Sequence, residues 1–385
     1  MTGIRQTDAS KTYLSAKKTD NHTFYTTGIA GRDQQKKDRM KTKAMIAAAM
    51  AGLFVSAAAQ DVMAQPKTDF RPDETVLLYG EKLVDNTDPV VADKVTCAGF
   101  RMEESNGLTG PEEINGAGNI GNINVNARFD LYFPKKPNGQ MVIVCPGGGY
   151  SIVSSYNEGV YVAEWLAERG ITAAVVKYRL PAGHWEVPLA DVQNTFRYCR
   201  ENAEKWGISQ IGVMGFSAGG HLAVTASVMY ADAATRPDFS VFIYPVVTFD
   251  TTVSHGGTHD QLIGNEREFT SRSGKTWKEW DRAKRQYSML EKRYSLENQV
   301  SLDNAPAFLA LCSDDRTVPA ENSIRLYRSL LSCNVPVEMH IYPSGGHGWG
   351  FSAERYVGKG HDGFSYARDE FYSSLERWLE AQRNR

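Results

Sequence analysis

Ser217 lies in a pattern of residues that can make a serine hydroxyl a nucleophile. Residues Gly215 to Gly219 read G-x-S-x-G, between the apolar run 211–214 and the helix-forming run 221–226. Such a strand–turn–helix context holds the hydroxyl on a sharp turn beside the free N–H groups of a helix N-terminus. A glycine-rich turn without any chemistry would contain the same five residues, so the hypothesis needs a base and an acid elsewhere in the chain.

A base and an acid follow in suitable places. One expected strand, 306–312, runs into two adjacent aspartates, and a second, 336–342, runs into a glycine-rich loop that carries His347. Loops at the carboxyl ends of parallel strands meet at one edge of a sheet. A histidine takes the serine proton, and a carboxylate orients that histidine. We therefore predict a triad of Ser217, His347 and one of the two aspartates.

Three consecutive glycines, 147–149, follow another expected strand at 141–145. Glycines let the backbone approach a substrate closely, and acyl transfer needs N–H donors where the tetrahedral oxyanion forms. We predict that the N–H groups of Gly148, Gly149 and Ala218 form this oxyanion hole. The alternative is a glycine-rich turn that only separates two elements.

Six motifs occur in an order and spacing that resemble a known family. They are Pro-Gly-Gly-Gly-Tyr (146–150), Lys-Tyr-Arg-Leu (177–180), Pro-Leu-Ala-Asp (188–191), Gly-Phe-Ser-Ala-Gly-Gly-His-Leu-Ala (215–223), Asp-Arg-Thr-Val-Pro (315–319) and Gly-Gly-His-Gly (345–348). Together they resemble the acetyl esterase/lipase branch of the α/β-hydrolases, and more narrowly its bacterial acetyl-xylan-esterase-like members. The resemblance covers roughly residues 120–382. Many members carry His-Gly-Gly-Gly where this chain has Pro146 before the glycines.

The resemblance implies an α/β-hydrolase fold, with a mostly parallel central sheet and helices on both faces. It also implies a catalytic triad of Ser217, Asp315 and His347. The family pattern Asp-x-x-Val-Pro fits Asp315, so Asp314 is expected to cap or turn the loop. The implied activity is the removal of acetyl or other short acyl groups from carbohydrate, by way of an acyl-enzyme intermediate.

The rest of the catalytic region, 126–382, alternates in the manner of βαβ units, which predicts a parallel sheet. Residues 128–133 are expected to pair antiparallel with 141–145 through the Asn138-Gly139 turn, a strong hairpin signal. Further strands are expected at 171–178, 211–214 and 239–244, and helices at 158–169, 189–206, 218–230, 320–333 and 363–381.

The segment 248–303 breaks this alternation and is expected to form a small cap. Residues 266–293 hold nine Lys or Arg and five Asp or Glu, with Trp277 and Trp280 among them. They read as a solvated charged helix or, alternatively, as a surface that contacts sugars. His255-x-x-x-His259-Asp260 suggests a metal site, but a third ligand is missing and we expect no metal.

Tyr150 and Trp349 flank the predicted oxyanion loop and the predicted base. We expect them to bind substrate and to limit the acyl pocket to acetate or similar groups. Nucleotide-binding loops of the P-loop and dinucleotide types are absent from the sequence, and we expect no cofactor. The expected partner is a small-molecule or oligosaccharide ester.

The first 64 residues are expected to lie outside the enzyme. Residues 40–64 combine a basic start, an apolar core of roughly 16 residues and an Ala-ended site, as a signal peptide does. The core is shorter than the about 20 apolar residues of a membrane span, so stable membrane insertion is not expected. Met40 then reads as the true start, 1–39 as upstream sequence, and the protein as secreted or periplasmic. Residues 66–125 are expected to be an extension that packs on the sheet.

The formal net charge of −2 gives no argument for nucleic acid binding. The five cysteines are an odd number, and a Cys199–Cys333 disulfide and the oligomeric state stay open. A peptidase of the prolyl-oligopeptidase kind is one rival, but it usually carries a β-propeller for which the chain has no room. A non-catalytic carbohydrate-binding protein is another, and the triad argues against it.

Overall fold

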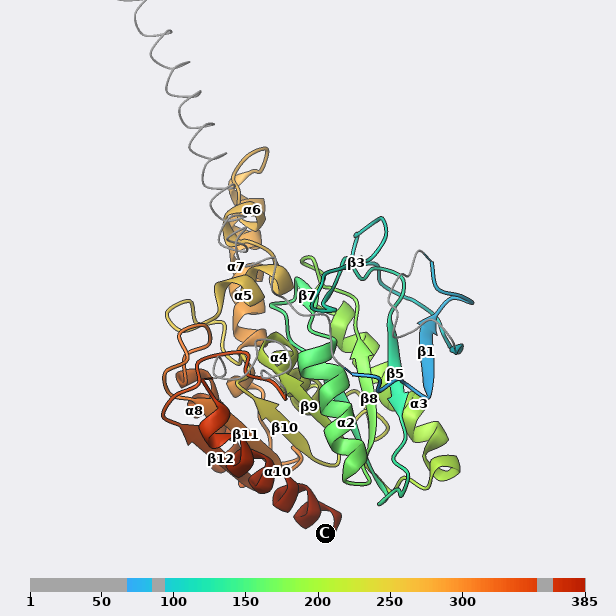
Figure 1. Ribbon diagram of the computed structural model, residues 1–385. Helices are drawn as coiled ribbons and strands as arrows, with labels where there is room; N and C mark the ends of the chain where they lie inside the picture. The colour runs from blue at the N-terminus through green and yellow to red at the C-terminus, as the bar shows by residue number, and fades with distance from the viewer. Residues whose placement is uncertain (1–67, 85–93, 352–362, 385) are drawn as a thin grey trace, which may run out of the picture. The chain divides into compact units, whose positions relative to one another are not determined.

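Nine strands of the described residues form one sheet, which is mostly parallel (Figure 1). The computed structural model describes residues 68–84, 94–351 and 363–384. The strands are β1 (Glu74–Tyr79), β2 (Val95–Phe100), β5 (Arg128–Tyr132), β6 (Gln140–Cys145), β8 (Thr172–Lys177), β9 (Gln210–Phe216), β10 (Ser240–Ile243), β11 (Ala307–Cys312) and β12 (Val337–Tyr342). Their order is β12-β11-β10-β9-β6-β8-β5-β1-β2, and β5 runs antiparallel to both of its neighbours.

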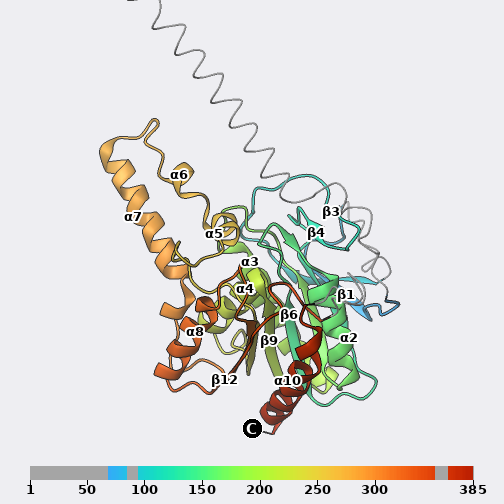
Figure 2. The same ribbon diagram turned by 60° about the vertical axis from the view of Figure 1, so that its left-hand side comes forward.

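Helices cover both faces of this sheet (Figures 1 and 2). Helices α3 (Val187–Trp206), α4 (Ser217–Val228) and α8 (Glu321–Ser332) contribute to one hydrophobic cluster. Helices α2 (Tyr161–Glu168) and α10 (Arg368–Arg383) contribute to a second cluster on the opposite face. Strands β6, β8 and β11 are buried along their whole length, as strands covered on both faces must be.

This arrangement confirms the predicted fold class, because the strands and helices alternate as βαβ units around a parallel sheet. The predicted hairpin is wrong. β5 pairs antiparallel with β8 and β1, whereas β6 pairs in parallel with β8 and β9. Asn138 instead joins the turn before β6 to the turn before β8, since its N–H donates to the Gly170 carbonyl at 2.8 Å.

The segment 66–125, which we expect to be an extension that packs on the sheet, contributes strands to the sheet itself. Its strands β1 and β2 continue the sheet edge beyond β5. The short strands β3 (Glu113–Ile114), β4 (Ile120–Gly121) and β7 (Ile152–Val153) form a separate small sheet. The expected upstream segment 1–39 and signal peptide 40–64 lie outside the described residues.

Buried charge pairs connect this extension to the central strands. Arg128 binds Glu112 at 2.7 Å, with both side chains almost fully buried. Arg179 binds Asp191 at 2.6 Å, and the Tyr79 hydroxyl of β1 donates to the same carboxylate at 2.7 Å. The Lys-Tyr-Arg-Leu and Pro-Leu-Ala-Asp motifs therefore contribute a structural ion pair.

The segment 248–303 contains helices between β10 and β11, which Figure 2 shows standing away from the sheet. They are α5 (Gly256–Ile263), α6 (Glu266–Phe269), α7 (Trp277–Tyr294) and the 3₁₀ turn η4 (Leu296–Asn298). A capping box at Thr276 and Glu279 starts α7. Within the described part of the chain, no helix has the length and apolar composition that crossing a membrane requires.

Candidate active site

Ser217 lies on the sharp turn between β9 and α4. Its φ is +53°, a left-handed conformation that non-glycine residues seldom adopt. The two glycines of the motif allow the close packing of this turn. A Cβ on Gly215 would lie 2.2 Å from the Gly219 carbonyl oxygen, and one on Gly219 would lie 2.2 Å from the Cys145 and Pro146 oxygens. Neither position can therefore hold a larger residue without backbone movement.

The structure brings Ser217, His347 and Asp315 into one hydrogen-bonded line. His347 Nε2 lies 2.8 Å from Ser217 Oγ, and its Nδ1 lies 2.6 Å from Asp315 Oδ2. Asp315 is buried, and its other oxygen accepts hydrogen bonds from the Thr317 and Val318 N–H groups at 2.9 Å each. This arrangement places the proton on Nδ1 and leaves Nε2 free to accept the serine proton.

The neighbouring Asp314 has a different function in the same loop. Its carboxylate accepts hydrogen bonds from Gly346 N at 2.8 Å and Gly345 N at 3.3 Å. Both donors belong to the loop that presents His347. Asp314 therefore connects the loop after β11 to the loop after β12, while Asp315 contacts the imidazole itself.

The glycine loop after β6 lies beside the serine. Gly148 and Gly149 have φ values of +128° and +63°. Among the described residues, no group accepts a hydrogen bond from either N–H. Ala218 is the second residue of α4, where a helix N–H has no partner within the helix. Its N–H and those of the two glycines are thus available to a substrate oxygen.

Tyr150 and Trp349 are both buried, so their exposure gives no support to the expectation that they bind substrate. Tyr150 is 1% exposed, and Trp349 is 3% exposed. The Trp349 ring packs against Tyr244 and stacks on Phe364, with ring centroids 4.8 and 3.9 Å apart. Both residues support the site from within the core.

His221 forms a buried network beneath the elbow. Its Nε2 lies 3.0 Å from the Tyr294 carbonyl oxygen, which can only accept, so Nε2 carries the proton. Its Nδ1 lies 3.1 Å from the Tyr150 hydroxyl and accepts from it. Burial lowers the pKa of His221 from 6.5 to about 4, although the bond to Tyr294 opposes this change. The ring stays neutral and structural.

Acid is expected to destabilise the fold through His221. Because its pKa is lower in the folded protein, the unfolded chain binds the proton first as the pH falls below about 6.5. The free energy of unfolding should fall between pH 6.5 and 4, by on the order of 3 kcal/mol from this group. In His221→Gln, which can keep both bonds without titrating, urea unfolding at pH 7 and 4.5 should show a smaller loss. Equal losses in the two proteins would contradict this.

The metal hypothesis for His255 and His259 has no support in the geometry. His255 caps α5 and accepts from Thr258 N through Nδ1, while its Cε1 faces Gly149. His259 is buried and contacts Asp260 and Glu291 at 2.8 and 3.3 Å. The described residues contain no group of three or more His, Cys, Asp or Glu side chains placed to hold a metal. All five cysteines are free thiols, so Cys199 and Cys333 are not bonded.

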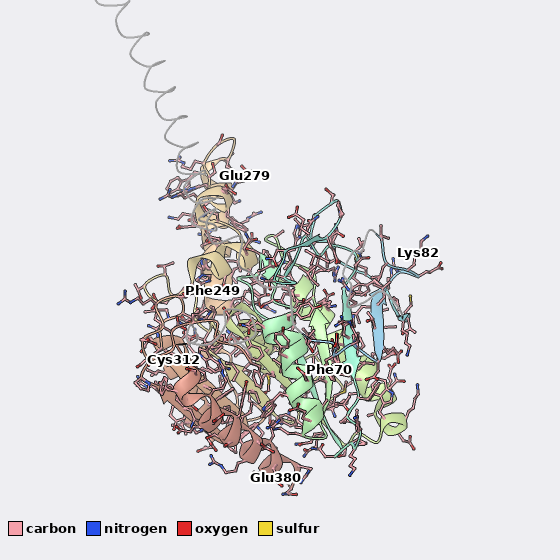
Figure 3. The ribbon with its side chains drawn as sticks, in the orientation of Figure 1. Phe70, Lys82, Phe249, Glu279, Cys312 and Glu380 are labelled. Carbon is pink, nitrogen blue, oxygen red and sulfur yellow. The ribbon has the colours of Figure 1, made fainter. Side chains whose placement is uncertain are left out.

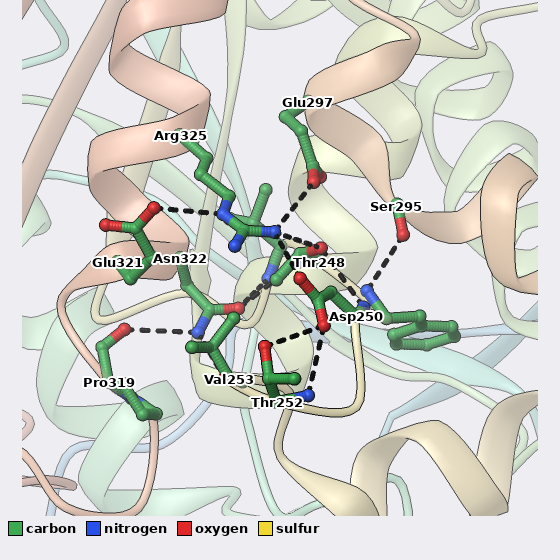
Figure 4. A network of polar contacts seen from close by, with 12 residues as sticks. Thr248, Asp250, Thr252, Val253, Ser295, Glu297, Pro319, Glu321, Asn322 and Arg325 are labelled. Atoms are coloured by element: carbon green, nitrogen blue, oxygen red, sulfur yellow. Dashed lines mark hydrogen bonds and ion pairs between the residues drawn. The ribbon is translucent and has the colours of Figure 1, made fainter. Parts of the chain in front are cut away.

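The base of the 248–303 segment is attached to α8 by a polar network (Figure 4). The Asn322 side chain accepts from Val247 N and Thr248 N and donates to Val253 O. Arg325 binds Asp250 at 3.0 Å. Because α8 follows the Asp315 loop directly, these contacts fix the segment relative to Asp315.

The outer end of this segment is exposed. Figure 3 shows Glu279 at the far end of α7 and Phe249 at the base of the segment. Trp277 is 63% exposed, and its ring lies 4.8 Å from that of Trp280. The Arg272 guanidinium lies above both rings, at 5.3 and 5.4 Å. The tryptophans are therefore part of an exposed surface cluster with Arg272.

Two residues lie near the site that the sequence did not place there. His255 is the side chain nearest to the open side of Gly149, and Glu158 accepts a hydrogen bond from Gly147 N at 2.7 Å. Glu158 lies in the polar start of an expected helix, and nothing in its neighbours along the chain signals a buried carboxyl. Only the fold brings these two side chains to the glycine loop.

Comparison with known proteins identifies the family. The BD-FAE family model matches residues 129–330. An acetylxylan esterase from Xylanibacter ruminicola is 35% identical over 259 residues, which are 66% of this chain and 48% of that protein. An endo-1,4-β-xylanase B from Butyrivibrio fibrisolvens is 28% identical over 63% of this chain and 36% of that protein. This chain thus spans about half or less of the length of these relatives.

A solved structure agrees with this result. The acetyl ester-xyloside bifunctional hydrolase from Caldicellulosiruptor lactoaceticus is 30% identical, with a TM-score of 0.53. The similarity covers 66% of this chain and 88% of that one. The matched family region includes the glycine loop, the Ser217 elbow and Asp315. The chain therefore belongs to the BD-FAE family, which is of the α/β-hydrolase type.

Proposed function

We propose that the protein is a serine carboxylesterase that removes acetyl groups from acetylated carbohydrate, as an acetyl xylan esterase does. The observation that carries the proposal is the line from Ser217 through His347 to Asp315, beside three available N–H groups. The family and the esterases among its relatives support the reaction class, a carboxylic ester hydrolase. The names of the 35% and 28% identical relatives support xylan as the carbohydrate.

The geometry supports a two-step reaction. Ser217 Oγ attacks the ester carbonyl carbon while its proton moves to His347 Nε2. The oxyanion accepts hydrogen bonds from Gly148, Gly149 and Ala218, and Asp315 stabilises the imidazolium. His347 then protonates the leaving sugar oxygen. A water activated by His347 hydrolyses the acyl-enzyme and releases acetate.

Short acyl groups are expected to react faster than long ones. Ser217 is only 7% exposed, which favours a small acyl group over a long chain. Fitting extra methylenes into a filled site costs about 1–3 kcal/mol, which corresponds to roughly 5- to 150-fold in rate. The test is kcat/KM for aryl esters from C2 to C8, beside acetate release from acetylated xylo-oligosaccharides. A faster C8 ester would contradict the acyl preference, and inert acetylated sugars would overturn the carbohydrate assignment.

We also propose that the enzyme is exported by the signal peptide at 40–64 and begins at Gln60 or Gln65. The basic start, apolar core and Ala-ended site support export. N-terminal sequencing of the native protein tests this, and a mature chain that keeps residues 1–39 would overturn it.

A further inference from the structure

Glu158 is a buried carboxyl group beside the catalytic machinery that no step of the reaction above uses. It lies in the π-helical turn η3 (Tyr156–Val160) and is 4% exposed. Its Oε2 accepts from Gly147 N at 2.7 Å, and its Oε1 accepts from the Tyr244 hydroxyl at 2.8 Å. Each carboxyl oxygen thus has one donor, and the two donors come from different parts of the chain.

The first donor belongs to the oxyanion loop. Gly147 directly precedes Gly148 and Gly149, and it lies between the carboxyl group and the elbow. A Cβ on Gly147 would lie 2.7 Å from Glu158 Oε2 and 2.9 Å from Ser217 Cβ. Glu158 therefore contacts the loop at the point where it passes the nucleophile.

The second donor, the Tyr244 hydroxyl, links Glu158 to the loop that carries His347. The Tyr244 hydroxyl also accepts from Gly350 N at 3.0 Å. The Tyr244 ring packs on the His347 ring, with centroids 4.8 Å apart. Through this tyrosine, one carboxyl group connects the oxyanion loop with the loop after β12. Short π-helical turns such as η3 occur often at functional sites.

We propose that Glu158 is a positioning residue, which holds the oxyanion loop and, through Tyr244, the His347 loop in the geometry that acyl transfer requires. The inference rests on the proposed esterase function. Without the carboxyl group, Gly147 N–H and the Tyr244 hydroxyl would lose their acceptor inside the protein, and both loops would move to find new partners. A misplacement of about 1 Å in such a site costs on the order of 100-fold in rate.

The test is a double-mutant cycle of Glu158→Ala and Tyr244→Phe, with kcat and KM measured on an aryl acetate. Glu158→Ala should lower kcat by about 10- to 100-fold with little change in KM, because the oxyanion bonds form fully only in the transition state. Tyr244→Phe should cause a smaller loss, and it should add little to Glu158→Ala because both changes break the same connection. Glu158→Gln, whose amide oxygen can still accept from Gly147 N, should recover part of the loss.

Glu168→Gln is the matched control, since this glutamate lies on the adjoining α2 with its side chain 68% exposed. It should leave kcat unchanged. Circular dichroism and Tm verify folding, and if Glu158→Ala does not fold, Glu158→Gln replaces it in the cycle. An unchanged kcat, losses that multiply in the double variant, or an effect confined to KM would overturn the inference. An inactive wild-type enzyme would instead contradict the proposed function.

Discussion

Ser217→Ala and His347→Ala should each lower kcat by about 10⁴- to 10⁶-fold, the range found when a triad member is removed. The alanine at 217 removes the oxygen that would form the acyl-enzyme, and the alanine at 347 removes the imidazole nitrogen that lies 2.8 Å from Ser217 Oγ. The double variant should be no slower than either single variant, because the two residues act as one unit. The measurement is kcat on an aryl acetate, after folding has been verified by circular dichroism.

Ser332→Ala and His340→Ala are suitable controls for these two changes. Ser332 is exposed at the end of α8, and His340 pairs with Glu338 in β12. Both variants should keep most of the activity. A Ser217→Ala enzyme with more than about a hundredth of the wild-type kcat would show that another group is the nucleophile.

Asp315→Asn should lower kcat by about 10⁴-fold, whereas Asp314→Asn should stay within about tenfold of wild type. An amide at 315 favours the wrong imidazole tautomer, because its NH₂ cannot accept the Nδ1 proton. An asparagine at 314 keeps an oxygen that can accept from Gly346 N. Loss of this contact affects only the support of the His347 loop.

Measurement of kcat for both aspartate variants shows which of the two residues orients His347, and Tm is recorded to detect unfolding. An inactive Asp314 variant beside an active Asp315 variant would reverse the assignment. Two fully active variants would contradict a triad at this site.

Much of the candidate site could be predicted from the sequence because its residues follow strands. Each of the loops with Gly148, Ser217, Asp315 and His347 begins at the end of an apolar run, and parallel strands bring such ends to one edge. The order of strands and loops along the chain is therefore enough to predict that these four loops are neighbours. Motif spacing also distinguished Asp315 from Asp314, and the observed hydrogen bonds agree with that distinction.

Other features depend on contacts that the order of strands does not determine. The Asn138-Gly139 turn is a strong local signal, yet β8 lies between β5 and β6, so the hairpin cannot form. Tyr150 and Trp349 stand next to functional residues in the chain, but their side chains point into the core. Glu158 approaches Gly147 only because η3 folds back beneath the glycine loop.

The buried charge pairs at the N-terminal edge of the sheet determine where the chain can be shortened. A fragment cut to the family-matched region 129–330 would lose Glu112, the partner of Arg128, and Arg128 itself. It would retain Asp191 and Arg179 but lose the Tyr79 hydroxyl that binds them. It would also end before His347.

Without Tyr79, the buried Asp191 carboxylate would lose one hydrogen-bond donor, and leaving a buried polar group unsatisfied typically costs about 1–3 kcal/mol, a sizeable part of the stability of a domain. The Arg179–Asp191 pair lies between β8 and α3, whereas its third partner comes from β1. A fragment that keeps both this hydrogen bond and the Ser217–His347–Asp315 line thus has to include the strand Glu74–Tyr79 at one end and the loop with His347 at the other. A fragment limited to the family-matched residues 129–330 would contain neither the edge strand β1 nor His347.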